Sequence, residues 1–215
     1  MKKISLIIAG VFALTISSQA QHEQEARKIL DKMSDMYQTI PSFSAHISYT
    51  LKNEDFSESY EGEIGMKGGA FRLLTENQEI IINNNTSWTY LTEENEVNIS
   101  DYDPENEDIS PSNIYDLYKS GYKYMVFGEE VVDGKNCDVI DLSPSKKGSD
   151  YFRIRLYIDK TDSILRKFVM FETSGNRFIY DITNFDSKAN LPDSFFIFDE
   201  SQYEGIIVTN LRIGN

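Results

Sequence analysis

The sequence predicts an α+β domain built on one strongly curved antiparallel sheet of about ten or eleven strands, with two or three helices. Apolar and polar residues alternate over much of the chain, which is typical of strands with one buried face. The connections are short, so consecutive strands are expected to be antiparallel neighbours. A sheet this long is expected to curl. Helices that fill its hollow would make a simple core, and helices that only cover it would leave a ligand cavity.

The first twenty residues have the features of a secretory signal. Two lysines precede an apolar run over residues 4–16, and small residues up to Ala20 form the site that signal peptidase requires. We therefore expect residues 1–20 to be removed and residues 21–215 to form a single exported domain. No cysteine follows the cleavage site to accept a lipid, so the mature chain is expected to be released and not anchored.

The composition excludes one class of partner. The formal net charge is −14, and loss of the signal with its two lysines makes it about −16. Binding to nucleic acid depends on neutralising phosphates with cations, so nucleic acid is not an expected partner. The only cysteine, Cys137, has no intramolecular disulfide partner and is expected to be a small buried hydrophobe.

An amphipathic helix is expected directly after the signal, because apolar residues recur at helical spacing with charged residues opposite them. Pro41 ends this helix. Packing against a sheet is the commoner use of such an apolar face, and docking to a partner is the alternative. The face consists of Ala26, Ile29, Leu30, Met33, Met36, Tyr37 and Ile40.

Five strands are expected before residue 91. The first, over residues 43–52, has an apolar parity that begins at Phe43 and includes Ile47 and Tyr49. A hairpin over residues 60–74 turns at a Lys-Gly-Gly sequence, and a second over residues 79–90 turns at three asparagines, which tolerate positive φ. Trp88 and Tyr90 share a parity and are expected to point to the same side.

The acidic segment over residues 101–108 is expected to be a solvated loop. Its alternating carboxylates resemble a calcium loop, but Pro104 and the lack of a turn glycine argue against one. Ser110 and Pro111 are then expected to open a short helix that Gly121 ends.

The second half is expected to be a meander of strands joined by short turns. In the strand that begins at Tyr151, the residues Phe152, Ile154 and Leu156 share one parity. The next strand has apolar residues on both parities, so both its faces should be covered. The expected strands span residues 122–132, 137–142, 151–158, 164–171, 177–185, 195–198 and 206–208.

Six segments of the mature chain point to a known family by their order and spacing. The segments are the helix before the Phe43 strand, Gly62-Glu63-Ile64 leading to Phe71, Ile80-Ile81-Ile82-Asn83-Asn84 followed by Trp88-Thr89-Tyr90, Val139-Ile140-Asp141-Leu142-Ser143-Pro144, Arg177-Phe178-Ile179-Tyr180-Asp181-Ile182, and Phe196-Ile197-Phe198. Together they resemble the LolA family of periplasmic carriers of outer-membrane lipoproteins. Related envelope proteins, including the sensor domain of the sigma-factor regulator RseB, share the same half-barrel.

The resemblance implies an unclosed half β-barrel covered by helices, with an apolar cavity that holds the acyl chains of lipoproteins. It also implies a periplasmic monomer without a cofactor, which takes cargo from an inner-membrane ABC transporter to an outer-membrane acceptor. The lid is expected to contain Ile114, Leu117 and Tyr118. The cavity is expected to be lined by Ile47, Tyr49, Ile64, Met66, Phe71, Leu73, Trp88, Tyr90, Phe152, Ile154 and Leu156.

One segment departs from the family pattern. Lys67-Gly68-Gly69 stands where family members carry Lys-Arg-Pro, and that arginine is taken to hold the lid closed by hydrogen bonds to lid backbone. Its absence predicts different gating, with Arg72 as a candidate replacement.

Three functional hypotheses follow. The first is the acyl-chain carrier, and the second is an envelope sensor of the same fold that binds a partner through its acidic surface. The third is a hydrolase, which would need a cleft with paired carboxylates or a contact between Cys137 and His46. Neither His22 nor His46 has a companion at metal-ligand spacing, so we expect no metal site and no catalytic residues.

Overall fold

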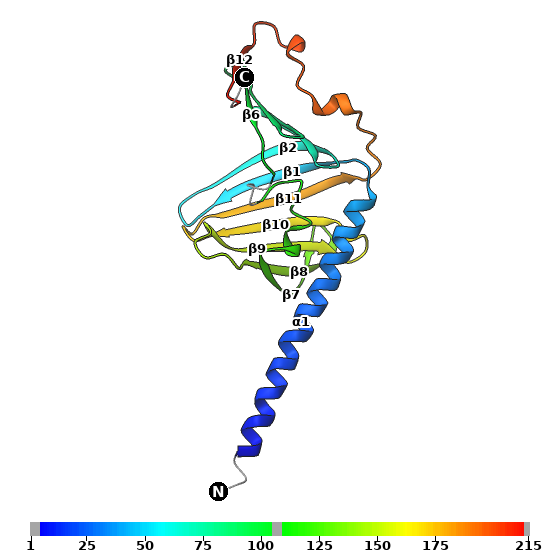
Figure 1. The fold of residues 1–215 in the computed structure, drawn as a ribbon, viewed down its shortest axis with the longest axis vertical. Helices are drawn as coiled ribbons and strands as arrows, with labels where there is room; N and C mark the ends of the chain where they lie inside the picture. The colour runs from blue at the N-terminus through cyan, green and yellow to red at the C-terminus, as the bar shows by residue number, and fades with distance from the viewer. Residues whose placement is uncertain (1–4, 105–108, 213–215) are drawn as a thin grey trace.

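The computed structural model describes residues 5–104 and 109–212, with side chains from residue 22 onward. The strands are β1 (Phe43–Lys52), β2 (Ser57–Lys67), β3 (Ala70–Thr75), β4 (Gln78–Asn83), β5 (Thr86–Leu91), β6 (Glu96–Asp101), β7 (Tyr122–Val132), β8 (Lys135–Pro144), β9 (Tyr151–Asp159), β10 (Leu165–Glu172), β11 (Arg177–Asp186) and β12 (Ile207–Asn210). The structure consists of a long helix, a large sheet and a C-terminal segment that leads from β11 to β12, beside β6 (Figure 1).

The twelve described strands form one sheet in the order β12-β6-β5-β4-β3-β2-β1-β11-β10-β9-β8-β7. All neighbours pair antiparallel except β12, which pairs parallel with β6. The α+β class and the unclosed, mostly antiparallel sheet are therefore confirmed, with one or two more described strands than expected. The antiparallel meander expected from the short connections runs from β7 to β11.

Helix α1 (Ser5–Thr39) ends just before Pro41, as the sequence predicts. Its buried residues follow one stripe at spacings of three and four. The stripe consists of Ala26, Leu30, Met33 and Tyr37, and it packs on a cluster that includes Ile140, Ile154 and Leu156 of β8 and β9. The helix thus fills only one half of the sheet's inner face, which leaves the other half for a cavity.

The described part holds a single α-helix, and two predicted elements take another form. The helix expected over residues 111–120 is a run of turns that ends in the 3₁₀ element η1 (Leu117–Lys119). Here the Asn113 side chain accepts the Ser110 backbone N–H, a local bond that competes with a regular helix. Residues 105–108 of the acidic loop lie outside the described residues.

The prediction of a strand over residues 195–198 is wrong. The chain there forms η2 (Asp193–Phe196), followed by η3 (Glu200–Gln202). Two side chains of the sheet donate hydrogen bonds to backbone carbonyls of η2: Arg72 binds that of Phe195, and Asn83 binds that of Phe196. The C-terminal segment therefore lies across the outer face of the sheet before β12 joins its edge.

Candidate functional site

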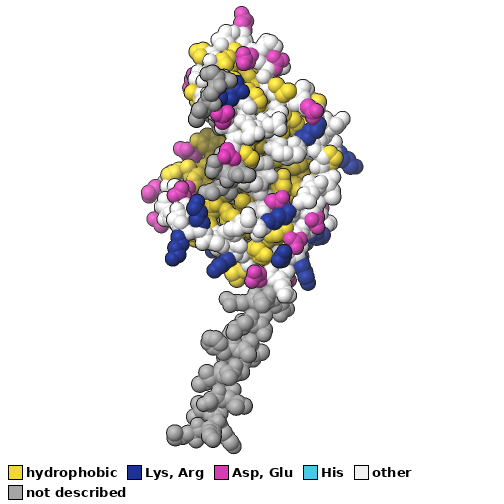
Figure 2. Space-filling view, in the orientation of Figure 1, with side chains coloured by type: hydrophobic (Ala, Val, Ile, Leu, Met, Phe, Trp, Pro, Cys, Tyr) yellow, Lys and Arg dark blue, Asp and Glu magenta, His cyan; other side chains and the backbone are white. Residues whose placement is uncertain are grey.

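An apolar cavity of about 470 Å³ lies on the inner face of the sheet, beside α1. This volume is in the usual range for small-molecule sites. Figure 2 shows hydrophobic side chains gathered in a hollow of the face that it presents. The lining residues are Tyr37, Phe43, Ala45, Ile47, Tyr49, Tyr60, Glu61, Gly62, Ile64, Met66, Leu73, Thr75, Asn77, Gln78, Ile109, Ser110, Pro111, Ile114, Tyr115, Leu165, Phe168, Met170, Tyr180, Ile182 and Phe185.

Strand register explains why these side chains meet. Ile47 of β1 lies opposite Ile182 of β11, and Tyr49 lies opposite both Tyr60 and Tyr180. Residues opposite one another in a sheet point to the same face. The alternating apolar residues of β1, β2, β10 and β11 therefore form one continuous surface.

Aromatic rings mark the two ends of this surface. At one end Phe43 contacts Tyr37 and Phe185, with centroids 5.5 Å and 4.9 Å away, and Tyr115 stacks on Tyr37 at 4.8 Å. At the other end Tyr49 contacts three rings. Its neighbours are Tyr60 at 6.1 Å, Phe178 at 6.1 Å and Tyr180 at 5.0 Å. The ends are six positions apart along β1, a distance of about 20 Å.

The cavity includes part of the predicted lining. Ile47, Tyr49, Ile64, Met66 and Leu73 line it, and so does Ile114 of the predicted lid. Phe71 does not line it but is buried beside Ile64 and Met66.

Three other predicted lining residues, all on β9, lie elsewhere. Ile154 and Leu156 are buried in the cluster under α1. Phe152, at the start of β9, is half exposed and contacts Phe171. None of the three lines the apolar cavity, because α1 covers Ile154 and Leu156 on the inner face and Phe152 lies with Phe171 on the outer face.

Trp88 and Tyr90 point to the same side, as expected, but that side is the outer face. They pack in a cluster with Ile81, Val97 and Phe196, beneath the C-terminal segment. Tyr90 contacts Tyr203 with ring centroids 4.5 Å apart. The structure thus places this aromatic pair outside the cavity.

Most lining residues were missed from sequence, and several of them lie on β10 and β11. Phe168 and Met170 lie on β10, and Tyr180, Ile182 and Phe185 lie on or at the end of β11. The sequence feature that could have indicated the β10 residues is the presence of apolar side chains at both odd and even positions of this strand. Both faces are indeed covered, since Phe168 and Met170 face inward while Val169 is buried in an outer-face cluster with Cys137.

The segment over residues 109–120 is joined to α1 by side-chain hydrogen bonds. Tyr118 donates to Asp31 at 2.6 Å and Ser34 donates to Asp116 at 2.5 Å. Burial, together with the bond to Asp31, holds the pKa of Tyr118 well above its usual value. Leu117 and Tyr118 are buried in the α1 cluster, and Ile114 reaches the cavity.

Arg72 does not contact this segment. Its guanidinium binds the Phe195 carbonyl at 3.1 Å and the Glu79 carboxylate at 2.6 Å on the outer face. It therefore fixes the C-terminal segment, and its proposed role as a substitute for the family's lid arginine is wrong.

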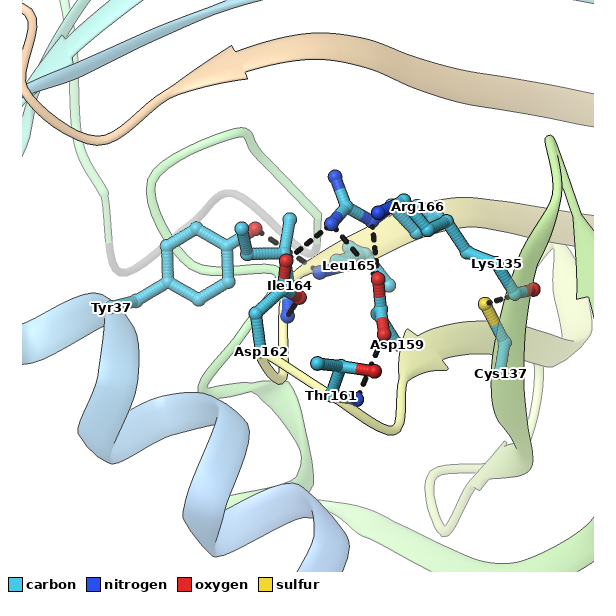
Figure 3. A network of polar contacts seen from close by, with 9 residues as sticks. All are labelled: Tyr37, Lys135, Cys137, Asp159, Thr161, Asp162, Ile164, Leu165 and Arg166. Atoms are coloured by element: carbon cyan, nitrogen blue, oxygen red, sulfur yellow. Dashed lines mark hydrogen bonds and ion pairs between the residues drawn. The ribbon is translucent and has the colours of Figure 1, made fainter.

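A polar network lies where α1 meets the β9–β10 turn (Figure 3). The Tyr37 hydroxyl accepts the Leu165 N–H at 3.3 Å, and Arg166 binds the buried carboxylate of Asp159 at 2.9 Å. Asp159 also accepts the Thr161 N–H at 2.8 Å. The Tyr37 bond joins the end of α1 that borders the cavity to this turn, and the other bonds hold the turn itself.

A larger hollow of about 710 Å³ is a poorer candidate for a ligand site. Its lining includes Asp162 and Arg166, which bind each other, and Lys167 and Asp181, which are 3.2 Å apart. These four charges already have partners and the lining is largely polar, so the apolar cavity is the candidate site.

The structure does not bring Cys137 and His46 together, as one form of the catalytic hypothesis requires. His46 lies on β1 and binds Glu63, whereas Cys137 lies on β8, with three strands between them. Burial raises the pKa of the Cys137 thiol to about 11, which opposes thiolate formation. Within the described residues, no group of three potential ligands could hold a metal ion. In the same part of the chain, no helix is long and apolar enough to cross a membrane.

Solved structures are similar to this chain at low sequence identity. A conserved protein from Thermus thermophilus is 16% identical with a TM-score of 0.59, over 86% of this chain and 99% of that one. The Mycobacterium tuberculosis lipoprotein LppX is 12% identical with a TM-score of 0.50, over 77% and 99%. The chain matched in the Pseudomonas aeruginosa MucA/MucB complex is 15% identical with a TM-score of 0.48, over 81% and 61%.

The family follows from the sequence. Among curated proteins, none is significantly similar to this chain. The model of the family described as outer membrane lipoprotein carrier protein LolA, however, matches residues 16–168, which is well over half of the chain. The chain therefore belongs to the LolA family of outer membrane lipoprotein carriers.

Proposed function

We propose that this protein is a periplasmic carrier that shields the acyl chains of lipoproteins in the apolar cavity. It would be exported by a signal over residues 1–20 and would carry cargo, as a monomer, from an inner-membrane ABC transporter to an outer-membrane acceptor. The observation that carries the proposal is the cavity itself, which is about 470 Å³ in volume and lined mainly by aliphatic and aromatic side chains.

The cavity can supply the free energy that such a carrier needs. Burial of one methylene is worth about 0.8 kcal/mol, so ten carbons of an acyl chain are worth roughly 8 kcal/mol. The surface between the Phe43 and Tyr49 ends is about 20 Å long, which suits an extended acyl chain. Several of its side chains, such as Ile47, Phe168 and Ile182, are only partly buried, so cargo can be released without disrupting the core under α1.

The segment over residues 109–120 is the proposed lid. Ile109 and Ile114 line the cavity, while Leu117 and Tyr118 are anchored on α1. Because the hydrogen bonds to α1 come from Asp116 and Tyr118, residues 109–114 can move while η1 stays in place. Opening of this kind lets a ligand enter and leave without unfolding the domain.

Calorimetric titration of the purified, delipidated protein with a triacylated lipopeptide tests the proposal. A matched pair of variants comes from β3, because Leu73 lines the cavity and Leu74 is 48% exposed on the other face. Leu73→Glu places a charge in the acyl site and is expected to weaken binding more than about tenfold. Leu74→Glu is expected to bind as the wild type does.

Two results would contradict the carrier function. One is equal binding of the lipopeptide and of the same peptide without acyl chains. The other is an equal effect of Leu73→Glu and Leu74→Glu. Absence of lipopeptide binding by folded protein would favour the alternative, an envelope protein of the same fold that binds a protein partner.

A further inference from the structure

The cavity offers no counter-ion to an anionic ligand. Of its described lining residues, none is lysine, arginine or histidine, and Glu61 alone is charged. Glu61 lies opposite Ser48, one position out of phase with the inward-facing Tyr60 and Gly62, so its side chain belongs to the outer face. The polar groups that face the cavity are therefore all uncharged.

The uncharged polar groups include two tyrosine hydroxyls at one end. Tyr49 and Tyr180 lie opposite each other on β1 and β11, with ring centroids 5.0 Å apart. Within the described residues neither hydroxyl has a hydrogen-bond partner in the protein. Burial raises the pKa of Tyr180 to about 12 and also raises that of Tyr49, so both remain donors at neutral pH.

This end is the open end of the cavity. Tyr60, beside Tyr49, is 46% exposed, whereas the Phe43 end is covered by Tyr37 and Tyr115. An acyl chain that enters here would lie along β1 and would leave its head group beside the two hydroxyls.

The charges near this end are unfavourable to an anion. Glu58 accepts the Tyr60 hydroxyl at 3.1 Å, and Glu172 is close enough to raise the pKa of Tyr49 further. Two cations, Lys52 and Arg177, lie opposite each other at the ends of β1 and β11. The guanidinium of Arg177 contacts the Phe171 ring on the outer face, away from the cavity. No cation therefore compensates an anionic head group from within the described cavity lining.

We propose that Tyr49 and Tyr180 form a carbonyl-binding cap and that the cavity selects uncharged acyl esters and amides over fatty-acid carboxylates and phospholipid phosphates. The inference rests on the proposed carrier function and names its ligand class. An ester or amide carbonyl accepts hydrogen bonds from neutral hydroxyls. A carboxylate brought to the same place loses hydration without gaining a charged partner, which is costly.

The test compares lauramide with lauric acid, which have the same chain and differ only in the head group. At pH 8 we expect lauric acid to bind at least about tenfold more weakly. The acid binds in its neutral form because its pKa in the cavity is raised. Lauric acid should therefore bind most tightly at a pH below its pKa in solution. Its affinity should fall by up to about tenfold per pH unit as the pH rises above that pKa. Lauramide affinity should not change over this range.

The variants Tyr49→Phe and Tyr180→Phe test the cap. Each removes one hydroxyl and is expected to weaken lauramide binding about two- to tenfold. Tyr90→Phe is the control, because its hydroxyl lies on the outer face, outside the cavity, and binds Asn95. Equal affinity for acid and amide at pH 8, or hydroxyl variants no weaker than the control, would overturn the inference while leaving the carrier intact. Failure of both ligands to bind would overturn the carrier as well.

Discussion

Replacement of Arg166 by methionine should destabilise the protein strongly, because it leaves a buried carboxylate without its cation. The side chain of Asp159 is 1% exposed and that of Arg166 is 13% exposed. Two guanidinium nitrogens bind one carboxylate oxygen of Asp159, at 3.2 Å and 2.9 Å. Figure 3 shows this pair beside the turn that holds α1.

The magnitude follows from burial. Removal of one partner of a buried ion pair costs about 3–5 kcal/mol. Asp159 keeps its bond from the Thr161 N–H, so we expect the lower end, about 3 kcal/mol. For a domain of this size the loss corresponds to a fall in Tm of about 6–12 °C. Urea unfolding followed by circular dichroism measures it.

The pH dependence gives an independent check. Burial raises the pKa of Asp159, but the Thr161 N–H and Arg166 outweigh it and hold the pKa below its usual value. In the wild type this group therefore adds stability above its unfolded pKa, and the contribution is lost as pH falls. In Arg166→Met the folded pKa rises, so the destabilisation should shrink on acidification. A double variant with Asp159→Asn should recover part of the loss. A cost below about 1 kcal/mol with unchanged pH dependence would refute this reasoning.

Three further variants test other parts of the structure. Tyr118→Phe removes the hydrogen bond to Asp31 and should cost about 1–2 kcal/mol in urea unfolding; no change would mean that the bond does not hold the lid segment. Phe196→Ala should cost about 3–5 kcal/mol and shift the emission of Trp88 to the red; an unchanged spectrum would contradict the packing of the C-terminal segment over that ring. Gly68→Ala should cost about 1 kcal/mol, since φ is 57° there, whereas the control Gly69→Ala should be nearly neutral; equal costs would contradict the hairpin geometry.

Local signals predicted much of the fold. Pro41 placed the end of α1, and glycine or asparagine at positive φ, as at Gly68 and Asn84, placed the hairpins. Alternation gave the inward set of β1, which includes Ile47 and Tyr49. Each of these features depends on residues that are close in sequence.

Features that depend on distant residues were not predictable in this way. Alternation shows that Trp88 and Tyr90 share a face, but not that the C-terminal segment covers that face. A register irregularity between Leu165 and Lys167 puts Leu165 on the same side as Phe168, which breaks the parity rule on β10. Likewise, the strand pattern of Ile154 contains no sign that α1 packs on it.

The position of bound cargo tests the central claim most directly. A lipopeptide with a photoreactive group at the end of an acyl chain can be cross-linked to the protein and the adducts located by mass spectrometry. We expect adducts on the inward residues of β1, β10 and β11, such as Ile47, Met170 and Ile182. Adducts confined to the outer face, around Trp88 or Phe152, would contradict the assignment of the cavity as the acyl site.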